Sequence, residues 1–373
     1  MRIAIAGILN IAILKNSLGG TESFTYHLTE SLYNRKHDVT LFADSDSQTS
    51  ARLVSLCSEK EIKGVLESGI EARFLYHLLQ TKEIAKRSSE FDVVHNNYYD
   101  SFFFTPFVDW FDCPTITTVH NDFWQFKHMK KFFMNTYRPG KDIYVFVSEN
   151  ARKLAGNPVG SVAIHNGIDV SSYTFKSIPN GSYLFWLSRI SPNKGPKEAV
   201  ETALKTKKKL VLSAPPCPAG HRDYFDKYVG NLLSESIRFI GPLSSEEKIS
   251  HYANAKAFIF PIQWEEPFGL VMVEAMACGT PVVTFARGSV PEVIKDGETG
   301  FIVNPSSKDI RGSFIVKKTG IEGLCEAVEK IYSMPKDEYM QMRRNCRTHV
   351  EKNFTVERMV DDYEKVYRNI LKG

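Results

Sequence analysis

Residues 256–285 read KAFIFPIQWEEPFGLVMVEAMACGTPVVTF, and this stretch indicates how its half of the chain folds. Runs rich in Val, Ile, Phe and Ala at Lys256 to Ile262 and Pro281 to Phe285 predict strands buried on both faces, as in a parallel sheet. Between them Gly269 stands where a helix begins, and a Gly followed by a Pro marks its end. The stretch therefore predicts a strand, a helix over about Leu270 to Cys278, and a second strand.

The same alternation of strand and helix runs along both halves of the chain. Strand candidates are Arg2 to Ile8, Asp38 to Ala43, Phe91 to His95, Pro114 to His120, Asp142 to Ser148 and Ser161 to His165, then Tyr183 to Leu187, Leu210 to Ser213, Ile237 to Ile240 and Phe301 to Val303. Regular alternation with helices predicts an α/β fold of two doubly wound sheets. Ligands bind such sheets beyond the carboxyl ends of the strands, so two domains facing across a cleft would hold the chemistry between them.

The polar stretch SSYTFKSIPNGS, residues 171–182, predicts a linker between the domains. We therefore expect an N-terminal domain over 1–175 and a C-terminal domain over 182–353. A last helix, about Val356 to Leu371 within 354–373, carries an apolar stripe that must be buried somewhere. Its members are Met359, Val360, Tyr363, Val366 and Tyr367.

Length and composition narrow the class of protein. A chain of 373 residues is long enough for two domains, each with its own core. The formal net charge of +4 argues against a nucleic-acid binder, which concentrates Lys and Arg. The six cysteines are scattered, without metal-ligand or redox spacing, which indicates a reducing compartment. No run approaches the roughly 20 apolar residues of a membrane span, and no cleavable apolar leader precedes Arg2, so we expect a soluble, cytoplasmic protein.

Two carboxylates and two cations form the candidate site. Glu266 precedes the helix predicted from Leu270 and Glu274 lies within it, near a helix N-terminus that favours an anion. Arg189 and Lys194 lie on the loop SRISPNKG after the strand ending at Leu187. Two cations at the carboxyl end of a strand suit a departing diphosphate.

These motifs occur in a characteristic order along the chain. They are GGTE at 19–22, VHND at 119–122, HNGID at 165–169, SRISPNKG at 188–195, the E-x7-E pair of Glu266 and Glu274, and RGSVPEVIKDGETGF at 287–301. In order and spacing the chain resembles the retaining glycosyltransferases of the GT-B fold, glycosyltransferase family 4 in particular. The resemblance implies two Rossmann-like domains, a last helix that crosses back to the N-terminal domain, and transfer of a sugar from a nucleotide-diphosphate-sugar to an acceptor hydroxyl.

The resemblance also implies residue roles. Arg189 and Lys194 would stabilise the leaving diphosphate, Glu266 would bind sugar hydroxyls, and Glu274 the ribose. His120 would lie beside the reacting centre. The remaining donor contacts would come from Phe268, the backbone at Gly269, Leu270 and Val271, the glycine lip of Gly19 and Gly20, and the base pocket at Ile240 and Gly241. Acceptor contacts are expected from Asn96, Tyr98, His120 and Asn121. No cofactor and no metal are expected, and UDP is the base expected first, ahead of GDP and ADP.

Two departures from the family pattern concern sugar and base identity. Pro267 precedes the Phe-Gly pair where the family commonly has a small residue, and SAPPCPAG at 213–220 replaces a glycine-rich loop. Asp44-Ser45-Asp46 has the D-x-D form of metal-dependent glycosyltransferases, but Asp and Ser also favour loops for local reasons. The aromatic and basic stretch FWQFKHMKKFF, 123–133, fits either a core and cleft lining or peripheral contact with an anionic membrane surface.

Two other functions stay open on the sequence alone. A nucleotide-sugar epimerase can share the fold, and would turn over donor without an acceptor. A non-catalytic scaffold subunit is the alternative from another class, and would bind no nucleotide diphosphate. The acceptor itself, whether sugar, lipid or small molecule, is not identified by these residues.

Overall fold

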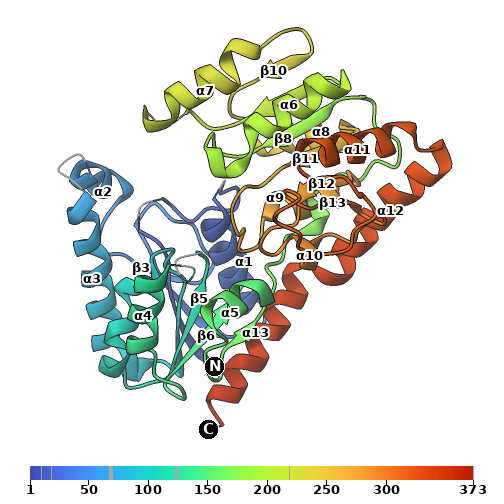
Figure 1. The fold of residues 1–373 in the computed structure, drawn as a ribbon. Helices are drawn as coiled ribbons and strands as arrows, with labels where there is room; N and C mark the ends of the chain where they lie inside the picture. The colour runs from blue at the N-terminus through green and yellow to red at the C-terminus, as the bar shows by residue number, and fades with distance from the viewer. Residues whose placement is uncertain are drawn as a thin grey trace. The chain divides into compact units, whose positions relative to one another are not determined.

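The computed structural model describes residues 1–9, 11–17, 19–66, 70–121, 124, 126–217 and 219–372. The chain forms two compact units (Figure 1). Unit 1 contains Met1–Ile168 and Val356–Gly373, and unit 2 contains Asp169–Thr355. Asp122, Phe123, Gln125 and Pro218, which belong to sequence motifs named above, lie outside the described residues.

Unit 1 is built on a parallel sheet of order β3-β2-β1-β4-β5-β6-β7. Its strands are β1 (Arg2–Ala6), β2 (Asp38–Phe42), β3 (Arg52–Val54), β4 (Val93–Asn96), β5 (Thr115–Val119), β6 (Asp142–Phe146) and β7 (Val162–Ala163). Its α-helices are α1 (Gly20–Asn34), α2 (Glu59–Leu66), α3 (Ile70–Lys86), α4 (Lys127–Thr136), α5 (Glu149–Ala155) and α13 (Val356–Ile370). The strand order reverses beside β1, which is where open α/β sheets bind ligands.

Unit 2 repeats the architecture with a parallel sheet of order β10-β9-β8-β11-β12-β13. Its strands are β8 (Leu184–Leu187), β9 (Leu210–Ser213), β10 (Ile237–Phe239), β11 (Ala257–Phe260), β12 (Val282–Phe285) and β13 (Gly300–Val303). Its α-helices are α6 (Pro196–Thr206), α7 (Arg222–Tyr228), α8 (Ser245–Asn254), α9 (Leu270–Ala277), α10 (Val290–Val293), α11 (Gly320–Ser333) and α12 (Lys336–Asn353). The order reverses between β8 and β11, so the loops after these two strands share one edge.

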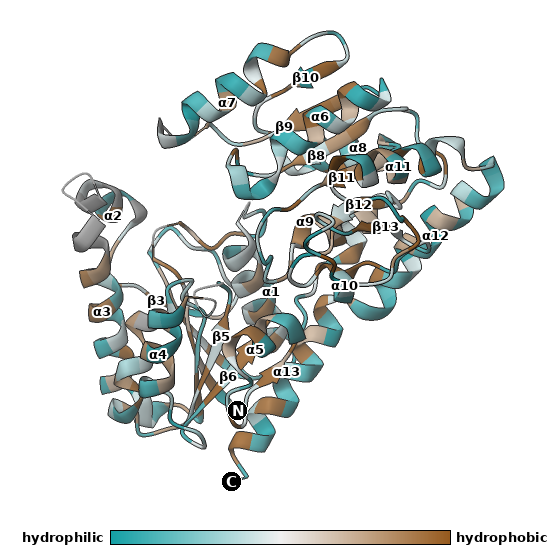
Figure 2. Ribbon diagram, viewed as in Figure 1, coloured by the Kyte–Doolittle hydropathy of each residue, from teal (hydrophilic) through white to brown (hydrophobic). Residues whose placement is uncertain are grey.

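The sequence-predicted elements of unit 2 are close to those observed. Helix α9 begins at Leu270 as predicted and ends at Ala277, one residue early. A capping box of Ser244 and Glu247 begins α8, where the sequence has the Ser-x-x-Glu pattern typical of a helix start. Most strand residues of both sheets are buried and apolar, and Figure 2 colours the ribbon by the hydropathy of each residue.

The stretch 171–182 differs from its interpretation as a linker, because it belongs to unit 2 and packs there. The hydroxyl of Tyr173 donates to Glu274 over 3.1 Å, and the backbone N–H of Lys176 donates to the carbonyl of Cys278 over 3.3 Å. A polar, turn-rich composition gives no sign of such long-range contacts. The change of unit comes earlier, at residues 168–169.

Helix α13 completes the core of unit 1. Its apolar stripe lies in one buried cluster with side chains of β1 and α1, among them Ile3, Phe24 and Leu28. Buried polar groups hold the helix as well: the hydroxyl of Tyr367 lies 2.7 Å from Nδ1 of His95, whose Nε2 lies 2.7 Å from Oγ1 of Thr118. The last 18 residues are therefore an integral part of unit 1.

Candidate functional site

The loop after β8 is held against the end of β11. Gly195 has φ of +69°, and a Cβ there would lie 2.1 Å from the carbonyl oxygen of Pro261. The indole N–H of Trp186 donates to the carbonyl of Lys194 over 3.1 Å. This fixed backbone directs the Lys194 side chain inward, whereas Arg189 on the same loop is exposed.

Lys194 and Glu266, predicted from separate motifs, form an ion pair. Lys194 Nζ lies 2.7 Å from Oε2 of Glu266, and both side chains are about nine-tenths buried. The same carboxylate oxygen accepts from the indole N–H of Trp264 over 2.9 Å, and the Lys194 ammonium lies 4.5 Å from the centre of the Trp264 ring. Burial has already removed most of the water around Lys194, and the charge of Glu266 balances its charge. A bound anion would therefore meet an ammonium group that is already positioned and largely dehydrated.

A second turn fixes the loop that presents Glu266. Gly288 has φ of +58°, and a Cβ there would lie 2.2 Å from the carbonyl oxygen of Glu266. Ser289 donates its backbone N–H to that oxygen over 2.9 Å and its hydroxyl to the carbonyl of Phe268 over 2.8 Å. Phe268 itself is buried, with its ring 5.8 Å from that of Phe354. The Phe268 side chain belongs to the core, so only its backbone can make the predicted contact with the nucleotide-sugar donor.

The N-terminus of α9 follows directly. Gly269, with φ of +80°, precedes the helix, and no described side chain caps it. The first N–H groups of a helix have no intrahelical acceptor, so those at Leu270 and Val271 can meet an anion. The predicted backbone contacts are thus available on the same edge as Lys194 and Glu266.

Glu274 is held by three side chains that the sequence did not single out. Its Oε1 lies 2.9 Å from Nζ of Lys248 and accepts from the hydroxyl of Tyr173 over 3.1 Å, and its Oε2 accepts from the hydroxyl of Tyr252 over 3.3 Å. Burial and the Glu274 charge raise the pKa of both tyrosines well above the ordinary value, so both remain donors. Lys248 lies on α8 and Glu274 on α9, so their ion pair becomes apparent only when the packing of the two helices is known.

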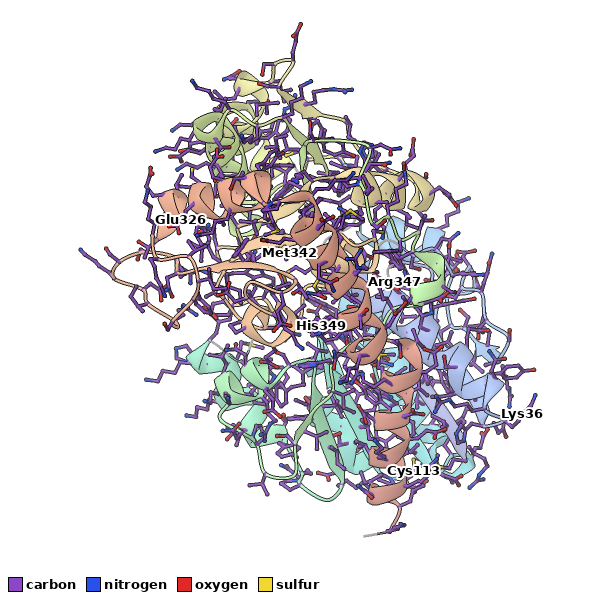
Figure 3. All side chains as sticks on the ribbon, turned by 90° about the vertical axis from the view of Figure 1, so that its right-hand side faces the viewer. Lys36, Cys113, Glu326, Met342, Arg347 and His349 are labelled. Carbon is purple, nitrogen blue, oxygen red and sulfur yellow. The ribbon has the colours of Figure 1, made fainter. Side chains whose placement is uncertain are left out.

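Helix α12 supports this assembly from behind. Arg343 is fully buried and donates to the carbonyls of Lys176, Ala253, Ala255 and Cys278 over 2.7–3.2 Å. Arg347, labelled in Figure 3, donates to the carbonyl of Ala277 over 3.0 Å. These bonds satisfy the last carbonyls of α8 and α9, the two helices that carry Lys248 and Glu274.

Ile240 and Gly241 lie at the ends of β9 and β10. The carbonyl of Gly241 accepts from the hydroxyl of Ser213 over 2.7 Å and from the backbone N–H of Ala214 over 3.2 Å. Gly241 has φ of +72°, and the space where a Cβ would lie is open among the described atoms. The predicted base pocket therefore has room at this position.

In unit 1, Gly19 and Gly20 begin α1, but the space beside Gly19 is filled. A Cβ on Gly19 would lie 2.0 Å from Oε2 of Glu22, whose side chain folds back over the turn. Glu22 is 5% exposed, and burial raises the pKa of its carboxyl. The predicted glycine lip is thus covered by a carboxylate, which a phosphate would have to displace.

His120 follows β5 and its ring packs edge-on to Phe24, with centroids 4.7 Å apart. Its Nε2 is buried and has no hydrogen-bond partner within the described part of the chain. Burial lowers the pKa of His120 to about 3, so the ring is neutral at physiological pH. A neutral imidazole with an unused nitrogen fits the predicted place beside a reacting group.

The other predicted acceptor residues have structural roles. Asn96 Oδ1 accepts from the backbone N–H of Tyr98 over 3.0 Å, Tyr98 is fully buried in a core cluster, and Asn121 donates to the carbonyl of Tyr99. A direct acceptor contact by the Tyr98 side chain does not fit this burial. Asn97 was missed: it is fully buried after β4, and both polar atoms of its amide lack partners among the described residues.

The D-x-D motif is a turn. Asp44 is buried, and its Oδ1 accepts from the backbone N–H of Asp46 and the hydroxyl of Ser47, each over 3.1 Å. The described residues contain no group of three His, Cys, Asp or Glu side chains that could hold a metal ion. Within the same residues, no helix is long and apolar enough to cross a membrane.

Two family models match the chain. Residues 18–172 match "Glycosyltransferase Family 4" and residues 175–311 match "Glycosyl transferases group 1". Together the matches cover more than three quarters of the chain.

Curated relatives carry related names. Phosphatidyl-myo-inositol mannosyltransferase of Mycobacterium tuberculosis is 25% identical over 83% of this chain and 84% of that protein. D-inositol 3-phosphate glycosyltransferase of Mycobacterium sp. (strain KMS) is 33% identical over 38% of this chain. That match spans 35% of the relative, so the chain covers about a third of its length.

Solved structures show the same fold along the whole chain. Sucrose-phosphate synthase from Thermosynechococcus elongatus is similar with a TM-score of 0.75 at 19% identity, covering 100% of this chain and 99% of that one. HepE from Anabaena in complex with UDP-glucose has a TM-score of 0.75 at 16% identity, covering 99% and 100%.

Proposed function

The chain belongs to glycosyltransferase family 4 and has the GT-B fold, and on this premise we propose that it transfers a sugar from a nucleotide-diphosphate-sugar to an acceptor hydroxyl with retention of configuration. The observation that carries the proposal is the buried Lys194–Glu266 pair beside the uncapped N-terminus of α9. It combines a cation, a hydroxyl-binding carboxylate and free backbone N–H groups at one sheet edge. These are the groups that a diphosphate-linked sugar needs.

The proposed chemistry is mainly electrostatic. As the bond between the anomeric carbon and the phosphate oxygen breaks, Arg189, Lys194 and the α9 N-terminus stabilise the charge on the departing diphosphate. The acceptor oxygen bonds to the anomeric carbon from the same face, and its proton passes to the leaving phosphate. Glu266 holds sugar hydroxyls and Glu274 the ribose, while Ile240 and Gly241 line the base pocket.

UDP is the donor base we favour. The structural relatives include HepE in complex with UDP-glucose and a UDP-forming trehalose-phosphate synthase, although a starch synthase bound to ADP is also among them. For the acceptor we propose a hydroxyl in glycan, glycolipid or glycoconjugate synthesis, presented beside His120 and Asn97 of unit 1. The curated relatives named for inositol acceptors support this class.

A thermal-shift panel of UDP, GDP, ADP and their sugars tests the proposal. A ligand at about 100 times its Kd stabilises the folded protein by about 2.7 kcal/mol, so the true donor should raise the melting temperature clearly. Lys194→Met is the matched variant, because it removes the proposed phosphate cation and should lose the shift. If no nucleotide diphosphate raises the melting temperature, the proposal fails in favour of a scaffold role.

We propose that the reaction needs no metal, because Arg189, Lys194 and the α9 N-terminus supply the positive charge that a divalent ion supplies elsewhere. Transfer should continue at its normal rate in EDTA. Loss of activity in EDTA that Mg²⁺ or Mn²⁺ restores would show that the proposal is wrong. Asp44 and Asp46 would then become candidate metal ligands.

We propose a cytoplasmic location. All six cysteines are free thiols, and four of them are buried inside the two units, which is typical of proteins kept in a reducing compartment.

A further inference from the structure

Helix α3 of unit 1 turns several polar side chains inward and a stripe of leucines outward. The inward face carries His77, Gln80 and Thr81, all at least 97% buried, and only its last turns add apolar residues, Ile84 and Ala85, to the core. The outward face carries Leu75, Leu78 and Leu79, which are 60%, 36% and 50% exposed. Spacing of i, i+3 and i+4 places the three leucines on one stripe, in a helix whose hydropathy Figure 2 shows. A surface helix of a globular protein normally has the opposite arrangement.

The orientation of α3 is fixed by its polar side. Gln80 Nε2 donates to the carbonyls of Gly7 and Phe42 over 3.0 and 2.9 Å, at the carboxyl ends of β1 and β2. The hydroxyl of Thr81 lies 3.3 Å from the carbonyl oxygen of Phe103, outside the helix. The leucines consequently cannot turn inward without breaking these buried bonds, and packing inside unit 1 does not explain them.

Neighbouring elements carry further exposed apolar side chains. The 3-10 helix η3 (Thr105–Trp110) contacts both α3 and α4, and its Trp110 is 59% exposed. On α4, Phe132 and Met134 are also exposed. We call Leu75, Leu78, Leu79, Trp110, Phe132 and Met134 the α3–α4 surface. Clusters of exposed apolar side chains of this kind mark interaction sites.

Lysines gather on the same surface, while Arg138 forms an ion pair with Asp109, the neighbour of Trp110. Lys82 and Lys86 continue the outward stripe of α3, and both are exposed. Residues 126–141 contain Lys127, Lys130, Lys131, Arg138 and Lys141 and no Asp or Glu. Lys127 and Lys131 are exposed and make no ion pair with any described residue. Leucines and aromatics bordered by unpaired lysines match the chemistry of an anionic lipid surface.

We propose that the α3–α4 surface docks unit 1 onto an anionic lipid bilayer. The leucines, Trp110 and Phe132 enter the boundary between headgroups and acyl chains, and Lys127 and Lys131 contact lipid phosphates. A second copy of the chain is the less favourable occupant, because a symmetric contact would bring the basic segments of both copies together. The proposal does not depend on the sugar-transfer reaction.

Vesicle binding tests it directly. The full-length protein should sediment with phosphatidylcholine vesicles containing about one third phosphatidylglycerol, and not with pure phosphatidylcholine. Raising the salt to about 0.5 M should weaken binding, since it shortens the screening length. Trp110 is the most exposed of the described tryptophans, so vesicle binding should shift the fluorescence to the blue, and Trp110→Phe should remove most of that shift.

Two double variants separate the apolar and electrostatic contributions. Lys127→Gln with Lys131→Gln should weaken binding about 25-fold, at about fivefold for each lysine near an anionic surface. Leu75→Gln with Leu79→Gln should also weaken it strongly. The matched control changes Leu204, which is 46% exposed on α6, and the exposed Lys209 to Gln, and should bind as the wild type does.

Nucleotide diphosphates should shift the melting temperature of all variants as they shift that of the wild type, because the changed side chains lie outside the donor site. This measurement checks that the variants fold. It also separates a failure of membrane docking from a failure of the proposed sugar transfer. Absence of binding to anionic vesicles overturns the proposal. Binding that both double variants leave unchanged does the same. A protein that is dimeric in ultracentrifugation and becomes monomeric in the leucine variant would instead assign the surface to a second copy.

Discussion

Glu266 and Glu274 are both carboxylates, but Glu266 bonds to Lys194 and Trp264, whereas Glu274 bonds to Lys248 and two tyrosines. Substitutions of the two residues should therefore have different effects on nucleotide binding and on turnover. Glu274→Gln should weaken binding of free UDP by about 1.5–3 kcal/mol, the usual loss for a charged hydrogen bond, because the ribose is present with or without the sugar. Glu266→Gln should leave UDP affinity nearly unchanged and reduce turnover of the full donor. Calorimetry with UDP and steady-state rates measure the two effects, and equal losses of UDP affinity would contradict the assignment.

Asp142 predicts a pH effect that is independent of catalysis. It is fully buried at the start of β6, accepts from the hydroxyl of Thr115 over 2.9 Å, and burial raises its pKa from 3.8 to about 7. Between these pH values the folded state holds a proton that the unfolded state has lost. Lowering the pH from about 7 to 4 should therefore stabilise the wild type relative to Asp142→Asn by about 1.4 kcal/mol per unit. Urea denaturation of both proteins across this range measures it, and a difference that does not change with pH would refute it.

For single residues, the sequence predicted which side chains belong to the site better than it predicted their interaction partners. Lys194 and Glu266 were each placed at the edge of the second sheet. Their ion pair was not predicted, because it joins positions 72 residues apart. The hydrogen bond from Trp264 to Glu266 was not predicted either, because it depends on the shape of one loop. Tyr173, Lys248 and Tyr252 were missed, because each reaches Glu274 only through the packing of α8, α9 and the segment after Asp169. Glu22 was quoted within a motif, but its fold over Gly19 depends on a side-chain conformation that no spacing encodes.

At the scale of elements, α12 predicts a link between stability and binding. Arg343→Leu removes the side-chain donor of the carbonyls of Lys176, Ala253 and Ala255, and an unsatisfied buried polar group costs about 1–3 kcal/mol. The melting temperature should fall, and UDP affinity should fall with it, because α8 and α9 lose their common support. Arg344→Leu, on the exposed neighbour that bonds only to Gln341 among the described residues, is the control and should change neither. Normal UDP affinity in a destabilised Arg343→Leu protein would show that α12 does not position the site.

Strands and helices were largely predictable, since each depends on local apolar periodicity and on Gly and Pro signals. The start of α9 at Leu270 and the capping box of α8 follow from such local signals. The segment at 171–182 was not predictable in the same way, because its contacts with Glu274 and Cys278 are long-range. The outward leucines of α3 illustrate a second limit: apolar periodicity gives a stripe, but buried hydrogen bonds such as those of Gln80 help to decide which side of the helix turns inward.

For the molecule as a whole, the arrangement of acids and bases predicts the stereochemistry. Inversion needs a base that can take the acceptor proton from the far side. Glu266 is bound by Lys194 and Glu274 by Lys248, and His120, whose pKa burial lowers to about 3, is a weak base. The proton should therefore pass to the leaving phosphate, and an α-linked donor should give an α-linked product. Anomeric proton couplings in the NMR spectrum of the product measure this.

The control for that experiment is Glu22→Gln. Glu22 is a buried carboxyl beside the Gly19 turn in unit 1, and it is a candidate base that the proposed mechanism does not use. If it plays no such part, the variant should make the same α-linked product. A β-linked product from the wild type would show that the proposed mechanism is wrong.

The chain leaves unit 1 at Ile168 and returns to it at Val356, so the two parts of one core are made at different times. At roughly 5–20 residues per second, a ribosome needs roughly 10–40 seconds to make unit 2 in between. During that interval Ile3, Phe24 and Leu28 have been made but lack the helix that later covers them. Unit 2 can fold while it is being translated, whereas the core of unit 1 stays incomplete until α13 has been made. Nascent unit 1 thus keeps part of its apolar core uncovered until α13 is made, and exposed apolar surface of this kind favours aggregation during synthesis.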